Sequence, residues 1–175
     1  KINSSEILHK TEAGGVKLHI QNEEEAAAAY NEIMENVART SPGKKTDGIL
    51  VQEMAPSGVE IIIGVTNDKQ FGPMLLVGLG GIYVEVFKDA ALYPVPLNKG
   101  EAMNMLKSLK SYKLLTGYRG SKPCDLDALT DMMVEISDYA YAHKDEIKEM
   151  DLNPVFVYPQ GEGVCAVDAL IVKYK

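Results

Sequence analysis

The sequence predicts a mixed α/β (α+β) fold in which a mostly antiparallel sheet is flanked by helices. Two observations support this class. Stretches with apolar residues at helical spacing occur alongside short runs rich in β-branched residues. The turns between successive β-like runs are short, which favours antiparallel neighbours because a parallel pair needs a crossover of about a dozen residues or more. The chain has 175 residues, enough for one sizeable core or two small lobes.

The first part of the chain predicts a strand followed by a helix. Residues 15–20 alternate between apolar and polar side chains, as a half-buried strand does. Asn22 then suits a helix N-cap, and the three glutamates after it lie where the helix dipole favours acids. The predicted apolar stripe of this helix consists of Ala26, Ala29, Tyr30, Ile33 and Val37. A loop follows at residues 41–48.

Strands predominate in the middle of the chain, and helices follow. Glycine and proline separate the β-like runs, which lie at residues 49–54, 59–67, 74–80 and 82–89. Helical spacing returns at residues 99–110 behind Asn98, a second probable cap. A longer helix is expected from Asp125 to about His143, and its apolar stripe consists of Leu126, Leu129, Met133, Ile136 and Ala140. The remaining residues, 149–170, read as a β-hairpin.

Charge and cysteine content exclude several classes of protein. The net charge is −7 and the pI is about 5.0, and no Lys/Arg cluster is dense enough for a nucleic-acid face. No apolar run has the length of a membrane span and no signal peptide is visible, which predicts that the protein has no membrane partner. Cys124 and Cys165 lack CxxC spacing, so we expect no structural zinc site and a reducing, cytoplasmic location.

The final hairpin carries polar side chains that suit a metal ion. If Tyr158 lies opposite Gly163, then Asn153 lies opposite Asp168, and opposed residues of an antiparallel pair share a face. Period-two alternation places Asp151 on that face as well. Mg²⁺ typically takes one or two carboxylates and completes its shell with water and substrate phosphates. The alternative is a polar edge strand whose aspartate bonds a backbone N–H or a lysine.

Two glycine-containing segments could meet phosphate. The run at 77–87 is no Rossmann fingerprint, because β-branched and aromatic residues follow its glycines where a helix would be needed. It is either a phosphate-binding turn or a turn that simply needs a positive φ. Near the N-terminus, lysines beside Gly14 and Gly15 suit a phosphate lid. His9 could accept a proton or a phosphoryl group at a ring nitrogen, or could be a solvated surface histidine.

The order of these motifs resembles a known family. The runs are SSEILHKTEAGGVKL, ILVQEMAPSGVEIIIGVTND, FGPMLLVGLGGIYVEVFKD, KLLTGYRG and EMDLNPVF…AVDALI. Together they resemble the ATP-grasp domain of ADP-forming acyl-CoA synthetases, relatives of succinyl-CoA synthetase. The likeness covers nearly all of residues 1–175. It implies that 1–45 are the remainder of a first lobe whose larger part is absent, and that 46–175 are the second lobe.

The resemblance also implies a reaction and a set of residues. The family interconverts acyl-CoA, ADP and phosphate with acid, CoA and ATP, through an acyl phosphate and a phosphohistidine on the CoA-binding partner domain. By motif, Asn153, Asp168 and Asp151 would hold Mg²⁺, and His9 would receive and pass on the phosphoryl group. Gln52 and Met54 would meet adenine beside Glu53, and Glu60 would hold the ribose. The full nucleotide-binding set is Lys1, Gly14, Gly15, Gln52, Glu53, Met54 and Glu60.

Partners and alternatives follow from the same resemblance. The domain would need a CoA-binding subunit or fused domain, in a hetero-oligomer, with ATP or ADP as its substrate. The family usually has an arginine where this chain has Tyr93, and Arg119 is a family feature without an assigned role. The alternative function is a non-catalytic, synthetase-like module that regulates a fused protein acetyltransferase. A phosphoryl-accepting His9 favours catalysis, because such a module has no need of one.

Overall fold

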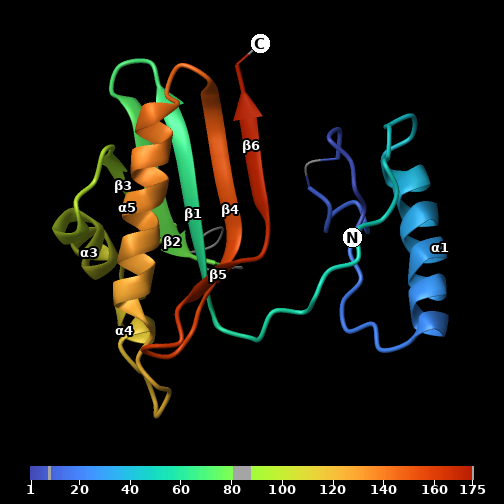
Figure 1. Cartoon of the computed structure of the whole chain (residues 1–175), viewed down its shortest axis with the longest axis horizontal. Coiled ribbons are helices and arrows are strands. Elements are labelled where there is room, and N and C mark those ends of the chain that lie inside the picture. The colour runs from blue at the N-terminus through green and yellow to red at the C-terminus, as the bar shows by residue number, and fades with distance from the viewer. Residues whose placement is uncertain (8, 81–87, 175) are drawn as a thin grey trace. The chain divides into compact units, whose positions relative to one another are not determined.

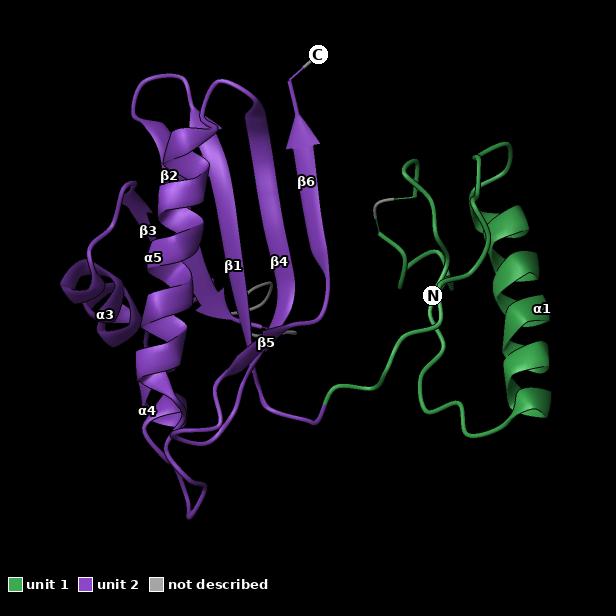
Figure 2. Cartoon of the chain, viewed as in Figure 1, with its two compact units in different colours: residues 1–55 green, residues 56–175 purple. Residues whose placement is uncertain are grey.

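The computed structural model of the chain describes residues 1–7, 9–80 and 88–174. The chain divides into two compact units, residues 1–55 and residues 56–175 (Figure 2). Each unit has its own hydrophobic cluster. Whether these units correspond to the predicted lobes stays a prediction.

Unit 1 consists of one helix packed on irregular chain. The helix α1 (Glu23–Thr40) begins where the sequence predicts, because the side chain of Asn22 accepts the backbone N–H of Glu25 at 2.9 Å. Only the second half of its predicted stripe is buried: Ile33 and Val37 pack with the N-terminal cluster residue Ile2. Residues 1–3 are held by backbone hydrogen bonds to residues 15 and 47–50.

Two predicted strands are absent from unit 1. Residues 15–20 form no strand ladder, and His19 has a φ of +60°, outside the β region. Of the run 49–54, only Ile49 pairs, in a single bridge to Ile2. The strand predicted from alternation is therefore wrong, because a strand also needs a partner of its own length, and the described part of this unit supplies none.

Unit 2 is a six-stranded antiparallel sheet with helices (Figure 1). The strand order is β3-β2-β1-β4-β5, and β6 also pairs with β4. The strands are β1 (Val59–Asp68), β2 (Gly72–Leu79), β3 (Ala90–Pro94), β4 (Ile147–Val157), β5 (Val164–Ala166) and β6 (Ala169–Lys173). The helices are α3 (Lys99–Ser108), α4 (Tyr112–Leu115) and α5 (Leu126–Ala142). The predicted fold class is therefore confirmed, although the part of the fourth β-like run at 82–87 lies outside the described residues.

The helices of unit 2 bury one face of the sheet. Along β1, Ile61, Ile63 and Val65 are at most 5% exposed, while the residues between them are more accessible. These three pack in one cluster with Leu106 of α3 and Met133 of α5, which runs alongside the strands (Figure 1). The other face, which we call the open face, carries Ile62, Gly64, Thr66, Leu76, Glu149, Asp151, Leu170 and Val172. Among the described residues of unit 2, no helix covers it.

The predicted helix boundaries in unit 2 are confirmed within two residues. Asn98 caps α3 in a complete capping box with Glu101, whose carboxylate in turn accepts the backbone N–H of Asn98. Asp125 caps α5 by accepting the backbone N–H of Ala128 at 3.1 Å. The sequence predicted Asn98 as a cap and Asp125 as the start of its helix. The short helix α4 was not predicted.

Candidate functional site

The predicted register of the final hairpin is confirmed. The backbone N–H of Tyr158 donates to the carbonyl of Gly163 at 3.1 Å, as expected for opposed residues. The three pairs between β4 and β5 follow the same register, including Phe156 with Cys165. Below them, β4 continues against β6 in that register, and Asp151 pairs with Leu170. A slip of one residue would have moved Asp168 to the opposite face.

Asn153 and Asp168 are neighbours across this hairpin, at an irregularity of the sheet. The backbone N–H of Asn153 donates to the carbonyl of Asp168 at 3.2 Å. On the other side of β4, Ile61 pairs with Val155 but Ile63 pairs with Leu152. Ile62 therefore faces two residues of β4, one of them Asn153, which is the pattern of a β-bulge. Bulges often lie next to active sites because they redirect a side chain.

Asp151 extends this group onto the open face. It pairs with Gly64 of β1 on one side and with Leu170 of β6 on the other. It also lines a shallow hollow of about 350 Å³ between these strands. Gly64 has no side chain, so the open face is hollowed beside Asp151. The position that a Cβ would occupy on Gly64 has no atom nearer than 3.8 Å.

This group is chemically suited to magnesium and too small to hold it alone. Among the described residues, no group of three or more His, Cys, Asp or Glu side chains could hold a metal ion. Asn153, Asp151 and Asp168 supply two carboxylates and one amide. Mg²⁺ is commonly bound by one or two carboxylates, with water and substrate phosphates in the remaining positions. The residues present therefore fit a magnesium ion that arrives with a nucleotide.

Unit 1 brings three predicted nucleotide-binding residues together. Lys1, Gln52 and Met54 all line one hollow of about 160 Å³. Its walls are mostly apolar, and Tyr30 of α1 contributes the aromatic side chain. Tyr30 is on the predicted apolar stripe of α1, but its side chain is 49% exposed and lines this hollow. The complete lining is Lys1, Lys17, His19, Ile20, Ala26, Ala29, Tyr30, Ile33, Ile49, Leu50, Val51, Gln52 and Met54.

The glycines of the predicted phosphate lid have a structural reason to be glycine. Gly14 has a φ of +67°, and a Cβ there would lie 2.9 Å from the Cβ of Asn36. A Cβ on Gly15 would lie 2.6 Å from Cγ2 of Ile2. The backbone N–H groups of both glycines donate within the turn, to the carbonyls of Thr11 and Lys10. In this conformation both amides are therefore already bonded within the turn.

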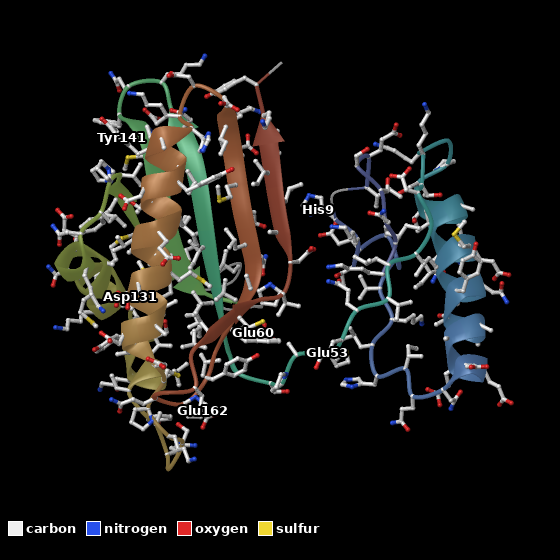
Figure 3. All side chains as sticks on the ribbon, in the orientation of Figure 1. His9, Glu53, Glu60, Asp131, Tyr141 and Glu162 are labelled. Carbon is white, nitrogen blue, oxygen red and sulfur yellow. The ribbon has the colours of Figure 1, made fainter. Side chains whose placement is uncertain are left out.

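His9 precedes that turn and is exposed (Figure 3). Its backbone carbonyl accepts the N–H of Ala13 at 3.1 Å, so the turn holds the position of the residue while the imidazole remains accessible. Glu53 is also exposed (Figure 3). Unlike Gln52 and Met54, it is not among the residues that line the hollow of unit 1.

Glu60 lies in unit 2, on β1 opposite Phe156 (Figure 3). It lines a further hollow of about 440 Å³ together with Tyr118 and Ser121. Gly80, the last described residue of the glycine-rich run, donates its N–H to the carbonyl of Glu60 at 2.7 Å. A Cβ on Gly80 would lie only 2.8 Å from the Cβ of Glu60, so close approach of the two backbones explains this glycine. Residues 81–87 of the run lie outside the described residues.

Two residues singled out by the resemblance also have clear positions. Tyr93 of β3 pairs with Leu75, which is fully buried, and its ring packs against the helix-covered core. Tyr93 therefore lies on the helix-covered face of the sheet and not on the open face. The guanidinium of Arg119 lies 5.4 Å from the ring centre of Tyr118, a cation–π contact at the rim of the Glu60 hollow.

Comparison with known proteins places this geometry in a family. The model of an ATP-grasp domain family matches residues 1–172. The chain belongs to this ATP-grasp family. Two similar relatives are the beta subunits of ADP-forming acetate–CoA ligases II and I of Pyrococcus furiosus, 44% and 42% identical over 172 residues. In both cases the match covers 98% of this chain and 73% of the relative.

Solved ATP-grasp structures agree with the fold. A Pyrococcus horikoshii protein superposes with a TM-score of 0.94 at 45% identity, over 99% of this chain and 73% of that one. An acetyl-CoA synthetase of Candidatus Korarchaeum cryptofilum, in complex with coenzyme A and Ca-AMPCP, superposes with a TM-score of 0.93 at 46% identity, over 99% of this chain and 75% of that one. Another structure of the same enzyme contains Mg-AMPPCP. Within the described residues, no helix has the length and apolar character needed to cross a bilayer.

Proposed function

We propose that the chain is the nucleotide-binding, phosphoryl-transferring part of an ADP-forming acyl-CoA synthetase. The reaction interconverts acyl-CoA, ADP and phosphate with a free acid, CoA and ATP. The observation that carries the proposal is the juxtaposition of Asn153 and Asp168 at a bulge of β4, in a chain 44% identical to the beta subunit of such a ligase. Because the relatives are named as subunits, we further propose a CoA-binding partner, either separate or fused, in the cytoplasm.

The role of the proposed metal-binding residues is to neutralise the negative charge of the nucleotide. Asn153 and Asp168, with Asp151 beside them, would hold a magnesium ion that neutralises the nucleotide phosphates. Phosphoryl transfer depends mainly on in-line positioning and charge neutralisation, so the protein needs little covalent chemistry at this point. Lys1 would add positive charge on the nucleotide side. In unit 1, the apolar hollow beside Gln52 and Met54 suits the flat ring of a base.

His9 would supply the single covalent step of this chain. Its neutral ring nitrogen attacks the phosphorus of an incoming phosphoryl group, a P–N bond forms, and the bond to the donor atom breaks. The phosphoryl group then passes to the terminal oxygen of ADP, which gives ATP and regenerates the imidazole. Exposure of His9 supports this role, because the donor must reach the ring directly.

A titration of MgADP by calorimetry tests the proposal. Wild-type protein should bind, and Asp168→Ala should abolish binding because one carboxylate of the metal site is lost. Asp145→Ala is the matched control, since Asp145 is an exposed aspartate in the turn between α5 and β4. The proposal is wrong if Asp168→Ala binds MgADP as tightly as the wild-type protein.

A further inference from the structure

The turn between β4 and β5 is tied to the start of α5. The backbone N–H of Asp125 donates to the carbonyl of Tyr158 at 2.8 Å, and that of Gln160 donates to Pro123 at 3.0 Å. Between them, Cys124 and Pro159 form an isolated β-bridge. The residues that lead into α5 thus form a short backbone contact with the hairpin turn, and the side chain of Asp125 lies at its centre.

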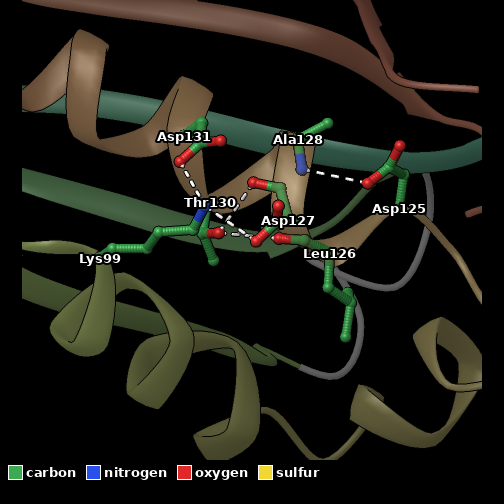
Figure 4. Close-up of polar contacts among 7 residues, drawn as sticks. All are labelled: Lys99, Asp125, Leu126, Asp127, Ala128, Thr130 and Asp131. Carbon is green, nitrogen blue, oxygen red and sulfur yellow. Dashed lines mark hydrogen bonds and ion pairs between the residues drawn. The ribbon is translucent and has the colours of Figure 1, made fainter. Parts of the chain in front are cut away.

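The Asp125 carboxylate accepts three backbone N–H groups. One oxygen, Oδ1, accepts from Ala128 at 3.1 Å and caps α5 (Figure 4). The other, Oδ2, accepts from Gly161 at 2.9 Å and from Gly163 at 3.0 Å, both in the turn. Asp125 is only 7% exposed, and a buried carboxylate is tolerated when hydrogen bonds replace its water.

The turn needs such an anchor because its own structure is unusual. Gly161 and Gly163 have φ values of +86° and +82°, with nothing within 4 Å of where a Cβ would lie. Both are glycines for their backbone conformation, and neither has a side chain that could hold the turn. Their hydrogen bonds to Asp125, together with the backbone contacts of residues 123–125, join this turn to the rest of unit 2.

The strand that follows the turn is poorly specified by its own ladder. β5 has three residues, none of them fully buried, and pairs with β4 over only three positions. Register is strongly specified where one face of a strand is buried and weakly where it is not. Asp168 lies between β5 and β6, and β6, which has no fully buried residue either, pairs with residues 149–152 of β4 in the register in which β5 leaves the turn. The position of Asp168 opposite Asn153 depends on that register.

We propose that Asp125 is a positioning residue for the magnesium ligands Asn153 and Asp168. By holding Gly161 and Gly163, it fixes where the hairpin turns and therefore which residue of the returning chain meets Asn153. The inference rests on the proposed function, since the ligand role of this pair belongs to it. A purely structural role, as the cap of α5, would affect stability but not the metal site in particular.

The two roles of the side chain can be separated by substitution. Asp125→Ser keeps an oxygen that can cap α5, since serine is a good N-cap residue, but it is too short and has too few acceptors to hold both glycines. The matched control is Asp89→Ser. Asp89 is also 7% exposed and its carboxylate also accepts two backbone N–H groups, from Lys110 and Ser111. These hydrogen bonds support the turn after α3.

The experiment measures Mn²⁺ affinity in the presence of ADP by electron paramagnetic resonance, together with hydrogen exchange of the Asn153 amide, on the full chain. Asp125→Ser should weaken Mn²⁺ binding by about tenfold or more, as loss of groups that orient metal ligands typically does. It should also speed exchange of the Asn153 amide, which bonds to Asp168. Asp89→Ser should lower the melting temperature but leave the Mn²⁺ affinity and the Asn153 exchange unchanged.

The outcomes distinguish a failure of the role of Asp125 from a failure of the proposed function. Wild-type affinity and Asn153 exchange in Asp125→Ser would overturn the inference, and so would equal losses of affinity in Asp125→Ser and Asp89→Ser. If wild-type protein binds no Mn²⁺ with ADP, the proposed function fails, and the Asn153 exchange alone still decides whether Asp125 holds the register. If Asp125→Ser does not fold, Asp125→Asn replaces it, because an amide has one acceptor oxygen and can serve only the cap or the turn.

Discussion

The backbone N–H of Asn153 donates to the carbonyl of Asp168 at 3.2 Å, so a main-chain hydrogen bond keeps the two residues side by side. A change of either side chain should leave this bond in place. The neighbouring bulge opposite Ile62 interrupts the β1–β4 ladder at the position of Asn153.

Substitution of Asn153 should therefore separate binding from stability. Asn153→Ala removes an exposed side chain but keeps the backbone bond to Asp168, so we expect weaker Mn²⁺–ADP binding and an unchanged melting temperature. Calorimetric titration and thermal unfolding measure the two effects. Asn104→Ala, at an exposed asparagine of α3, should change neither affinity nor, appreciably, stability. A large loss of stability in Asn153→Ala would show that its side chain is structural.

Loss of His9 should remove a phosphorylated form of the protein. With a CoA-binding partner, acetyl-CoA and labelled phosphate, wild-type protein should acquire acid-labile label, because a phosphohistidine is hydrolysed in acid. His9→Ala should lose the label on this chain while MgADP binding persists. His143→Ala is the control, since His143 lies against Tyr139 and near Glu146 at the end of α5. Full labelling of His9→Ala would exclude His9 from the transfer.

Much of unit 2 could be predicted because its signals are local. The cap at Asn98 and the apolar stripes of both helices defined α3 and α5 within two residues. The register of the hairpin followed from one assumption about its loop, that Tyr158 opposes Gly163. These features depend on neighbours in the sequence, so no knowledge of distant contacts was needed.

Other features depend on contacts that the sequence does not show. The alternation of residues 15–20 resembles a strand, yet no long partner exists for it among the described residues of unit 1. Tyr30 has the spacing of a core residue but lines a hollow, because the apolar stripe of α1 is longer than the surface on which it packs. The bulge at Asn153 also escaped prediction, since it is defined by the partner strand β1 and not by β4 alone.

Acid should weaken the contribution of Asp125 to stability. Its hydrogen bonds from Ala128, Gly163 and Gly161, with a smaller effect of Lys99, lower the pKa of this carboxyl below its ordinary value. A lowered pKa means that the contribution is complete above the unfolded value, about 3.9, and is lost as the pH falls through the folded value. The stability difference between wild type and Asp125→Asn should thus shrink below about pH 4.

Urea unfolding from neutral to acidic pH measures this difference. For the matched variant Asp89→Asn, the stability difference from wild type should also shrink in acid. Despite the burial of Asp89, hydrogen bonds from Lys110 and Ser111 lower the pKa of its carboxyl. A constant difference between wild type and Asp125→Asn across the acid range would show that the Asp125 carboxylate has the same pKa in the folded and unfolded protein.

The core of unit 2 should be sensitive to truncation at α3. Leu106 is fully buried in the cluster that joins α3, α5 and the sheet. Leu106→Ala should lower the free energy of unfolding by about 2–5 kcal/mol through lost burial and a residual cavity. Leu92→Ala is the control, because Leu92 on β3 is 50% exposed and loses little contact. Equal free-energy changes in urea unfolding would contradict the assignment of Leu106 to the core.

The loop that carries Tyr118 and Arg119 offers two glycines that differ in one respect. Gly117 and Gly120 have nearly equal φ values, +91° and +89°. A Cβ on Gly117 would lie 2.8 Å from the carbonyl oxygen of Ser121, whereas at Gly120 no atom lies within 4 Å. Gly120→Ala should therefore cost about 1–2 kcal/mol, the strain of a left-handed alanine, and Gly117→Ala should cost more because the Ser121 carbonyl must move as well.

Urea unfolding of both variants tests this difference. Ser121 is held by hydrogen bonds from its N–H and hydroxyl to the carbonyl of Tyr118, and its hydroxyl accepts the N–H of Tyr118, so it cannot move without breaking them. Equal costs for Gly117→Ala and Gly120→Ala would mean that the loop relaxes around a new side chain. The rigid loop that holds Arg119 against Tyr118, at the rim of the Glu60 hollow, would then be a flexible one.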